Sequence, residues 1–209
     1  MAGPRAARRP VFRTESDAGP EGIGAVVYGE DGAMLAFTSY RLPWARDLKN
    51  KFQNQREYIG LLIALVLLHR VCEQKGDRET AMLLRHQSVA VQFTGDNTTA
   101  QSWIEKQKVS SRFGQLSCMA VTWLQIHSQL RVEDQVHKEG IKMGFVDGLS
   151  RFRETPELDD RLCIDMRTDA ALTELLLTCD PSQDAHVIDH HVAFSRINDA
   201  MLAILHHRS

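Results

Sequence analysis

The sequence has few cysteines, no long hydrophobic run and no strong excess of either charge. The four cysteines are far apart and form no CxxC pair: Cys72, Cys118, Cys163 and Cys179. This spacing argues against a disulfide framework or a cysteine zinc site, and favours a reduced intracellular protein of the cytoplasm or nucleus. The longest apolar stretch, residues 59–68, is about half of the ~20 residues that a membrane-spanning helix needs, so no membrane partner is expected.

Charge and composition bound the class of protein. The formal net charge is −2, with 43% hydrophobic and 25% charged residues, which is typical of a soluble globular protein. Binding to nucleic acid would therefore depend on a local basic patch. Residues 1–10 are rich in arginine, but no apolar segment follows, so a disordered arm is predicted rather than a secretory signal.

Five short runs have the composition of β-strands. Residues 11–17, 22–29 and 33–40 are separated by turn residues, including Asp31-Gly32, and predict three antiparallel strands in succession. Residues 88–94 and 130–137 each follow a helical segment. Because a helical crossover returns a strand in the same direction, these two strands are expected to run parallel to the first.

Apolar residues at three- and four-residue steps predict helices over 53–74 and 112–129. A cap at Asn97 or Thr98 predicts a helix that runs to about 105, and residues 145–152 are expected to form a short helix. The fold class is therefore α/β, a five-stranded mixed sheet flanked by helices. Pro156 and the acidic residues after it indicate a boundary. We expect residues 11–155 to form a domain that folds without the rest, and residues 156–209 to form an extension with helices over about 168–178 and 186–206. Trp44 is expected to pack on the sheet rather than meet a ligand.

Four acidic residues occupy places where a metal site is built. Asp17 ends the first strand and Asp96 ends the fourth, so in parallel neighbouring strands they would lie side by side. Glu57 lies in the helix 53–74 and Asp147 in the helix 145–152. Carboxylates that close repel one another unless a cation lies between them, and oxygen ligands alone suit Mg²⁺ or Mn²⁺.

The four acids could also serve as helix caps or solvated surface groups. Glu57 is expected in the first turn of its helix, where the helix dipole favours a negative charge. Asp96 stands where a helix is capped, although Asn97 and Thr98 could also cap that helix.

Four segments carrying these acids resemble the ribonuclease H domain, of the type attached to retroelement reverse transcriptases. Residues 16–27, SDAGPEGIGAVV, are similar to the first hairpin of the family, and residues 54–58, NQREY, to its glutamate helix. Residues 94–100, TGDNTTA, are similar to the third motif. His137, followed ten residues later by Asp147 in VDGLSR, is similar to the closing motif.

The resemblance implies an endonuclease that cuts the RNA strand of an RNA–DNA hybrid with two Mg²⁺ ions, for which Mn²⁺ can substitute. It makes Asp17, Glu57, Asp96 and Asp147 the metal ligands and gives His137 a role in proton transfer or product release. Met143 stands where the family usually has asparagine, so the loop 138–144 is expected to fold differently. The natural partner domain would be a reverse transcriptase, separate or lost.

The hybrid would be held through its phosphates and its 2′-hydroxyl groups. The basic candidates for phosphate binding are Lys49, Lys51, Arg56, Lys106, Lys108 and Arg112. The polar candidates for the 2′-hydroxyl groups are Gln55, Asn97, Thr98 and Gln101. Histidines of the extension, such as His190 and His191, are expected to form a polar helix face rather than a metal cluster.

Two other functions stay open. The chain could be a ribonuclease H-like module that binds nucleic acid or protein without catalysis, from a domesticated or decayed element. It could also be another nuclease or a recombinase. Cleavage of a hybrid, compared with duplex DNA, duplex RNA and single strands, distinguishes the three.

Overall fold

The computed structural model describes residues 11–44, 52–75, 88–106, 109, 112–153, 159–180 and 189–206. The predictions for the arm 1–10 and for Lys49, Lys51 and Lys108 lie outside these residues.

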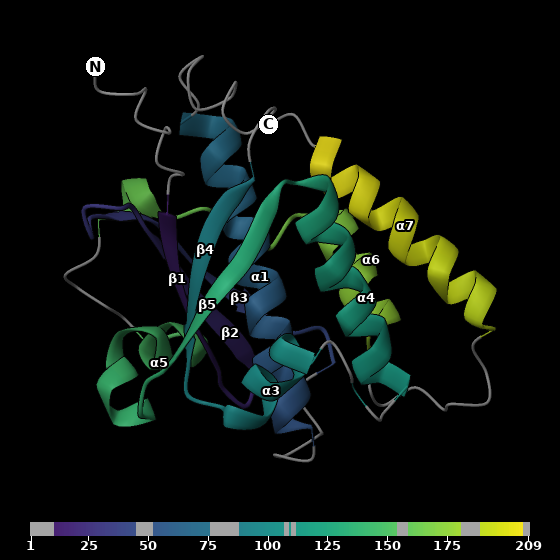
Figure 1. The fold of residues 1–209 in the computed structure, drawn as a ribbon, viewed down its shortest axis with the longest axis horizontal. Helices are drawn as coiled ribbons and strands as arrows, with labels where there is room; N and C mark the ends of the chain where they lie inside the picture. Colours follow the sequence, from purple (N-terminus) through teal and green to yellow (C-terminus); the bar gives the residue numbers. More distant parts are fainter. Residues whose placement is uncertain are drawn as a thin grey trace, which may run out of the picture.

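The centre of the molecule is a five-stranded mixed sheet with the order β3-β2-β1-β4-β5 (Figure 1). The strands are β1 (Val11–Ala18), β2 (Gly22–Tyr28), β3 (Met34–Arg41), β4 (Val89–Gly95) and β5 (Leu130–His137). β1, β2 and β3 pair antiparallel, whereas β4 pairs parallel with both β1 and β5. The predicted sheet, with three antiparallel strands and then two parallel ones, is confirmed.

The helices follow the predicted order with shifted ends. They are α1 (Gln53–Lys75), α3 (Thr98–Lys106), α4 (Arg112–His127), α5 (Gly144–Ser150), α6 (Ala170–Thr178) and α7 (His190–His206). The expected loop 138–144 contains a 3-10 turn, η2 (Gly140–Met143), and a second such turn, η3 (Asp160–Leu162), precedes α6. Since α1 begins at Gln53, Glu57 lies beyond its first turn, and the dipole explanation for Glu57 was wrong.

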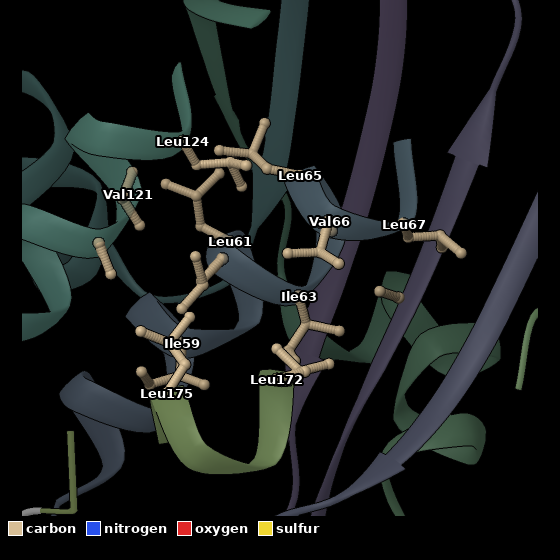
Figure 2. Close-up of a cluster of buried hydrophobic side chains, with 14 of the residues drawn as sticks. Ile59, Leu61, Ile63, Leu65, Val66, Leu67, Val121, Leu124, Leu172 and Leu175 are labelled. Atoms are coloured by element: carbon tan, nitrogen blue, oxygen red, sulfur yellow. The ribbon is translucent and has the colours of Figure 1, made fainter. Parts of the chain in front are cut away.

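One face of the sheet carries the main hydrophobic core. Side chains of β2 alternate, so Ile23, Ala25 and Val27 face this core while Val26 faces the other side. α1 packs on β1 and β2, and α4 packs on α1. Figure 2 shows side chains of α1 between those of α4 and α6, with Leu61 near Leu124 and Ile59 near Leu175.

The other face carries a much smaller cluster. α5 packs on β2, β1 and β3, and the buried residues there are Val26, Phe37, Met143, Val146 and Leu149. Met143, which stands in place of the expected asparagine, is 1% exposed and fixes the start of α5 to the sheet.

The C-terminal extension continues the main core. Buried residues of α6 and α7 belong to the same cluster as those of α1, namely Leu172, Leu175, Leu176, Ala193, Ile197, Ala200, Met201 and Ile204. Trp44 packs as predicted, since its side chain is 8% exposed and its indole N–H donates to the carbonyl of Leu176 at 3.1 Å. The extension and residues 11–155 therefore share one hydrophobic core, and independent folding of residues 11–155 stays a prediction.

Polar contacts join the extension to the sheet and to α1. Arg70 donates to Asp169 at 2.9 Å, and both side chains are buried. The hydroxyl groups of Tyr40 and Thr173 are 3.0 Å apart. Cys163 forms an isolated parallel bridge with Phe37 of β3, so the chain before α6 covers part of that edge strand. Among the described residues, no helix is both long and apolar enough to cross a membrane.

Candidate metal centre

Three carboxylates meet at the end of the sheet where β1 and β4 finish. Residues of β1 and β4 pair in parallel up to Glu15 and Thr94, so Asp17 and Asp96 each stand two residues beyond the same pair. Glu57 comes from α1, which packs across β1. One carboxylate oxygen from each of Asp17, Glu57 and Asp96 lies within 4.8 Å of the others. The structure thus brings together three of the four predicted ligands.

Glu57 is held in place by its own helix and by β1. Its side chain is 6% exposed. Gln53, one turn earlier, donates to Glu57 Oε1 at 2.5 Å and to the carbonyl of Ala18 at 2.8 Å. The backbone N–H of Ala18 donates to the Glu57 carboxylate. Gln53 was not a predicted site residue, although its i,i+4 spacing to Glu57 was a usable signal.

Asp17 is held by α5. The hydroxyl of Ser150 donates to Asp17 Oδ2 at 2.7 Å, and the Ser150 side chain is fully buried. This close approach depends on Gly24, because a Cβ there would meet the Val146 carbonyl and the backbone N–H of Ser150. Ser150 lies within the predicted closing motif, but the sequence indicated no role for it.

Asp147, the fourth predicted ligand, lies on α5 outside the group of three. Arg151 Nε donates to its Oδ1 at 2.6 Å, and Arg153 lies 3.6 Å from its Oδ2. Its charge still reaches Asp17 and raises the pKa of that carboxyl. The structure therefore places Asp147 beside the cluster, with its carboxylate held by two arginines.

The electrostatics of the cluster favour a bound cation. Burial is the main cause that raises the pKa of Glu57 well above its usual range, and the charges of Asp17 and Asp96 raise it further. Burial also raises the pKa of Asp17, against the hydrogen bond from Ser150. A divalent cation would offset both the burial and the mutual repulsion of these carboxylates. The donor set contains only carboxylate oxygens, so the residues fit Mg²⁺ or Mn²⁺.

Asp96 is free of the capping role that could have explained it. The side chain of Asn97, not Asp96, accepts the backbone N–H of Ala100 at 2.9 Å and caps α3. Gly140 packs against Asp96 so closely that a Cβ would lie 2.8 Å from Asp96 Oδ2. The turn η2 therefore borders the cluster.

His137 stands at the same end of the sheet. It is the last residue of β5, and it pairs in register with Gly95, which precedes Asp96. Its side chain is exposed.

The predicted substrate residues fall into three groups. Thr98 and Lys106 are exposed on α3. Asn97 donates to Asn54 at 2.9 Å, and Gln101 donates to the carbonyls of Gly95 and Val136, so both side chains hold the ends of strands and helices. The side chain of Arg112 lies outside the described residues.

Gln55 and Arg56 form the third group, because both are buried. Gln55 is 4% exposed and donates to the carbonyl of Cys179 at 3.2 Å. Arg56 is fully buried, and its three guanidinium nitrogens have no hydrogen-bond partner among the described residues. Burial lowers the pKa of Arg56. The structure therefore presents neither side chain to a substrate. An arginine in the first turn of a helix normally faces solvent, which is why the sequence suggested otherwise.

The histidines of the extension form no described metal cluster. Within the described part of the chain, the only group of three potential ligands is that of Asp17, Glu57 and Asp96. His191 is exposed on α7, and its backbone N–H donates to Asp189.

No protein-family model matches the sequence, and no curated protein is similar to it. Solved structures with some likeness include LC11 ribonuclease H1, isolated from compost by a metagenomic approach, at 21% identity and a TM-score of 0.48, covering 68% of this chain and 91% of that one. The same enzyme in complex with an RNA/DNA hybrid is 16% identical, with a TM-score of 0.49, and the match covers 69% of this chain and 96% of that one. The N-terminal ribonuclease H domain of Rv2228c from Mycobacterium tuberculosis is 17% identical, with a TM-score of 0.46, and the match covers 71% of this chain and 100% of that one. Likeness at this level carries neither fold nor activity to this chain, whose fold is given by its own strand order.

Proposed function

We propose that this chain is a metal-dependent endonuclease that cuts the RNA strand of RNA–DNA hybrids. The observation that carries the proposal is the convergence of Asp17, Glu57 and Asp96 within 4.8 Å at the ends of two parallel strands. Burial of two of these acids would be costly without a cation. The preference for a hybrid and a retroelement origin are supported by the sequence motifs alone.

Asp17, Glu57 and Asp96 would hold the ions, with Asp147 completing the set once its carboxylate leaves Arg151. The chemistry supplied by two bound Mg²⁺ ions, or Mn²⁺ in their place, would be activation of a water and stabilisation of the leaving oxygen of a phosphodiester. Ser150 and Gln53 orient Asp17 and Glu57 through their hydrogen bonds. His137 would deliver a proton to the leaving ribose oxygen from the end of β5.

The nuclease core would be formed by residues 11–155, with residues 156–209 as a helical extension that completes its hydrophobic core. The buried contacts of α6 and α7 with the main core support this division of roles.

One observation favours a second candidate, a binding module without catalysis. Asp147 is paired with Arg151 and Arg153, so the fourth acid is partly neutralised. A site that had lost its chemistry would keep this pairing in the presence of metal.

The test is cleavage of a labelled hybrid by the full chain, compared with duplex DNA, duplex RNA and single strands. We expect cleavage of the RNA strand in Mg²⁺ or Mn²⁺, and none in EDTA. Ca²⁺ should block it, because Ca²⁺ prefers a larger and looser oxygen shell. Equal activity in EDTA would exclude the mechanism, and binding of hybrid without any cleavage would favour the second candidate.

Asp96→Asn gives the sharper variant test. It removes one charge from the cluster while keeping an oxygen ligand, so cleavage should fall by about 10²-fold or more. The melting temperature without metal should stay the same or rise, because fewer carboxylates crowd together. The matched control is Asp134→Asn on β5, an exposed acid that accepts from Gln92 away from the cluster. Wild-type cleavage by Asp96→Asn would remove Asp96 from the site.

A further inference from the structure

A groove at the end of β3 is unused by the proposed chemistry. We name it the β3-end groove. Its volume is about 550 Å³, and it is lined by Tyr40, Arg41, Leu42, Pro43, Phe152, Arg167 and Thr173. Tyr40 and Arg41 end β3, and Leu42 and Pro43 follow it. Phe152 follows α5, and the last two residues belong to the extension.

The groove opens at the same end of the sheet as the acids. β2 runs antiparallel to both β1 and β3, so the end of β3 lies at the end of the sheet where β1 finishes. Arg41 pairs in register with Gly22, and the backbone N–H of Gly19 donates to the Gly22 carbonyl. Phe152 is two residues after Ser150, whose hydroxyl donates to Asp17. A strand of nucleic acid leaving the cluster could therefore enter this groove next.

Phe152 is held in an uncommon backbone conformation. Its φ is 55°, in the left-handed region that a bulky side chain rarely adopts. Its ring lies against Gly22, where a Cβ would come within 2.6 Å of the ring. The guanidinium carbon of Arg41 lies 4.8 Å from the centre of the same ring. The result is an aromatic surface with a cation beside it.

Among the described residues, each arginine of the groove forms an ion pair with an exposed carboxylate. Arg41 lies 3.6 Å from Glu21, and both side chains are about half exposed or more. Arg167 pairs with Asp165 at 2.7 Å, and its side chain is 68% exposed. The long, exposed pair of Arg41 and Glu21 contributes little, so a phosphate could replace the Glu21 carboxylate at small cost. Arg167 donates two hydrogen bonds to Asp165, at 2.8 and 2.7 Å, so a phosphate there would share the exposed guanidinium with Asp165 or displace it.

We infer that the β3-end groove binds one nucleotide of the strand that is cut, just beyond the cleavage site. Arg41 and Arg167 contact its phosphate, and the ring of Phe152 stacks on its base. Cationic grooves with aromatic side chains hold single strands in this way without reading their sequence. The inference rests on the proposed function, and it gives the extension a part in substrate binding through Arg167.

The experiment measures hybrid binding by fluorescence anisotropy with the full chain in EDTA, where cleavage does not occur. The probes are a short blunt RNA–DNA hybrid and the same hybrid with its RNA strand extended at one end or the other. One of the two extensions should increase the affinity. Arg167→Gln and Arg41→Gln should each remove that gain, which is a loss of roughly tenfold in affinity for the extended probe. Each variant should also reduce the slope of log K against log salt concentration by about 1.

Arg161→Gln is the matched control. Like Arg167, Arg161 pairs with a carboxylate two residues before it, Asp159, at 2.8 Å, and it is exposed. It does not line the groove. Equal losses in Arg161→Gln and Arg167→Gln would mean a general charge effect and would overturn the inference. Phe152→Leu should lose affinity for the extended probe while keeping the wild-type salt slope, and its melting temperature shows whether it folds.

Failure of the groove can be told apart from failure of the proposed function. If the wild-type chain cleaves the hybrid but neither extension increases affinity, the groove inference is wrong and the nuclease proposal stands. If an extension increases affinity but the arginine variants keep the increase, the groove inference is again wrong and the nuclease proposal stands. If the wild-type chain neither binds nor cleaves any of the probes, both proposals are wrong.

Discussion

The two faces of the sheet are built for different tasks. One face buries α1 beneath α4, α6 and α7 in a single large cluster, whereas the other holds α5 through five buried side chains. The large cluster supplies most of the buried apolar area and hence most of the stability. The small one brings Ser150 and Asp147 to the end of β1. Stability and placement of the site are therefore carried by opposite faces, and changes to each face should have separable effects.

The largest effect should come from removing residues 156–209. The truncated chain loses the buried side chains of α6 and α7 and exposes α1, so it should have no cooperative thermal transition and should bind the dye ANS. Circular dichroism during heating, with dye fluorescence, measures this. A cooperative transition in residues 11–155 would restore the independent domain that the sequence suggested.

The same glycine-to-alanine change should act differently on the two faces. In Gly24→Ala the new Cβ meets the backbone of Val146 and Ser150, so α5 must shift. The free energy of unfolding should fall by about 1–3 kcal/mol. In Gly60→Ala, on α1, the Cβ meets mainly the Ser16 hydroxyl, which can rotate, and alanine favours the helix by roughly 0.5–1 kcal/mol.

Chemical denaturation of both variants, with cleavage assays beside it, tests this difference. Gly24→Ala should lose cleavage as well as stability, because it displaces Ser150 from Asp17. Equal stability losses in the two variants would mean that α5 is no more sensitive to spacing than α1.

The third effect depends on pH. The pKa of Glu57 is raised in the folded chain above its usual 4.5, so between those two values the folded state binds more protons than the unfolded state. Without metal, stability should therefore fall as the pH rises through this range. Glu57→Gln should flatten that fall, and Mg²⁺ should reduce it in the wild-type chain.

Melting temperatures across the pH series in EDTA measure this effect. Glu105→Gln, which changes an exposed acid of α3, should keep the wild-type profile. An unchanged profile in Glu57→Gln would show that Glu57 is not the titrating group.

The smallest effect should come from single buried hydroxyls. Ser128→Ala removes the hydrogen bond to the Leu124 carbonyl, and Ser150→Ala removes the contacts with Asp17 Oδ2 and with the Asp147 carbonyl. Each change should cost on the order of 1 kcal/mol. Ser128 donates only to the carbonyl of Leu124, on the α4 side of the sheet. Ser150→Ala alone should also weaken Mg²⁺ binding, measured by calorimetry, because Asp17 loses its orienting donor. Equal Mg²⁺ affinities would make Ser150 a structural residue only.

The strands, the helices and the three-acid cluster could be predicted from sequence, because they depend on local periodicity and on one parallel pairing. Asp17 and Asp96 meet because the strands before them are parallel neighbours. Two features could not be predicted from the sequence. The burial of Arg56 depends on segments packed around α1 that its own sequence does not specify. The role of Ser150 depends on how closely α5 approaches Gly24.

The extension shows a further limit of local patterns. Its amphipathic helices were visible in the sequence, but nothing in them says which surface they cover. The signal lay in α1, where Ile59, Ile63 and Val66 add apolar surface on more sides than a sheet can cover. A helix that is apolar all round requires a second covering layer, and α6 and α7 provide it.

The pairing of β1 with β4 also affects the order in which the chain folds. β1 begins at Val11 but its parallel neighbour begins only at Val89, so the two ligand-bearing strands must close a long loop before they meet. The buried residue Ile204 of α7 joins later still. Such distant pairings make folding slow, and intermediates would expose the apolar surface of α1 until the last helix docks. A chain of this design would be most prone to aggregation during its synthesis, before the acid cluster has formed and before α6 and α7 cover α1.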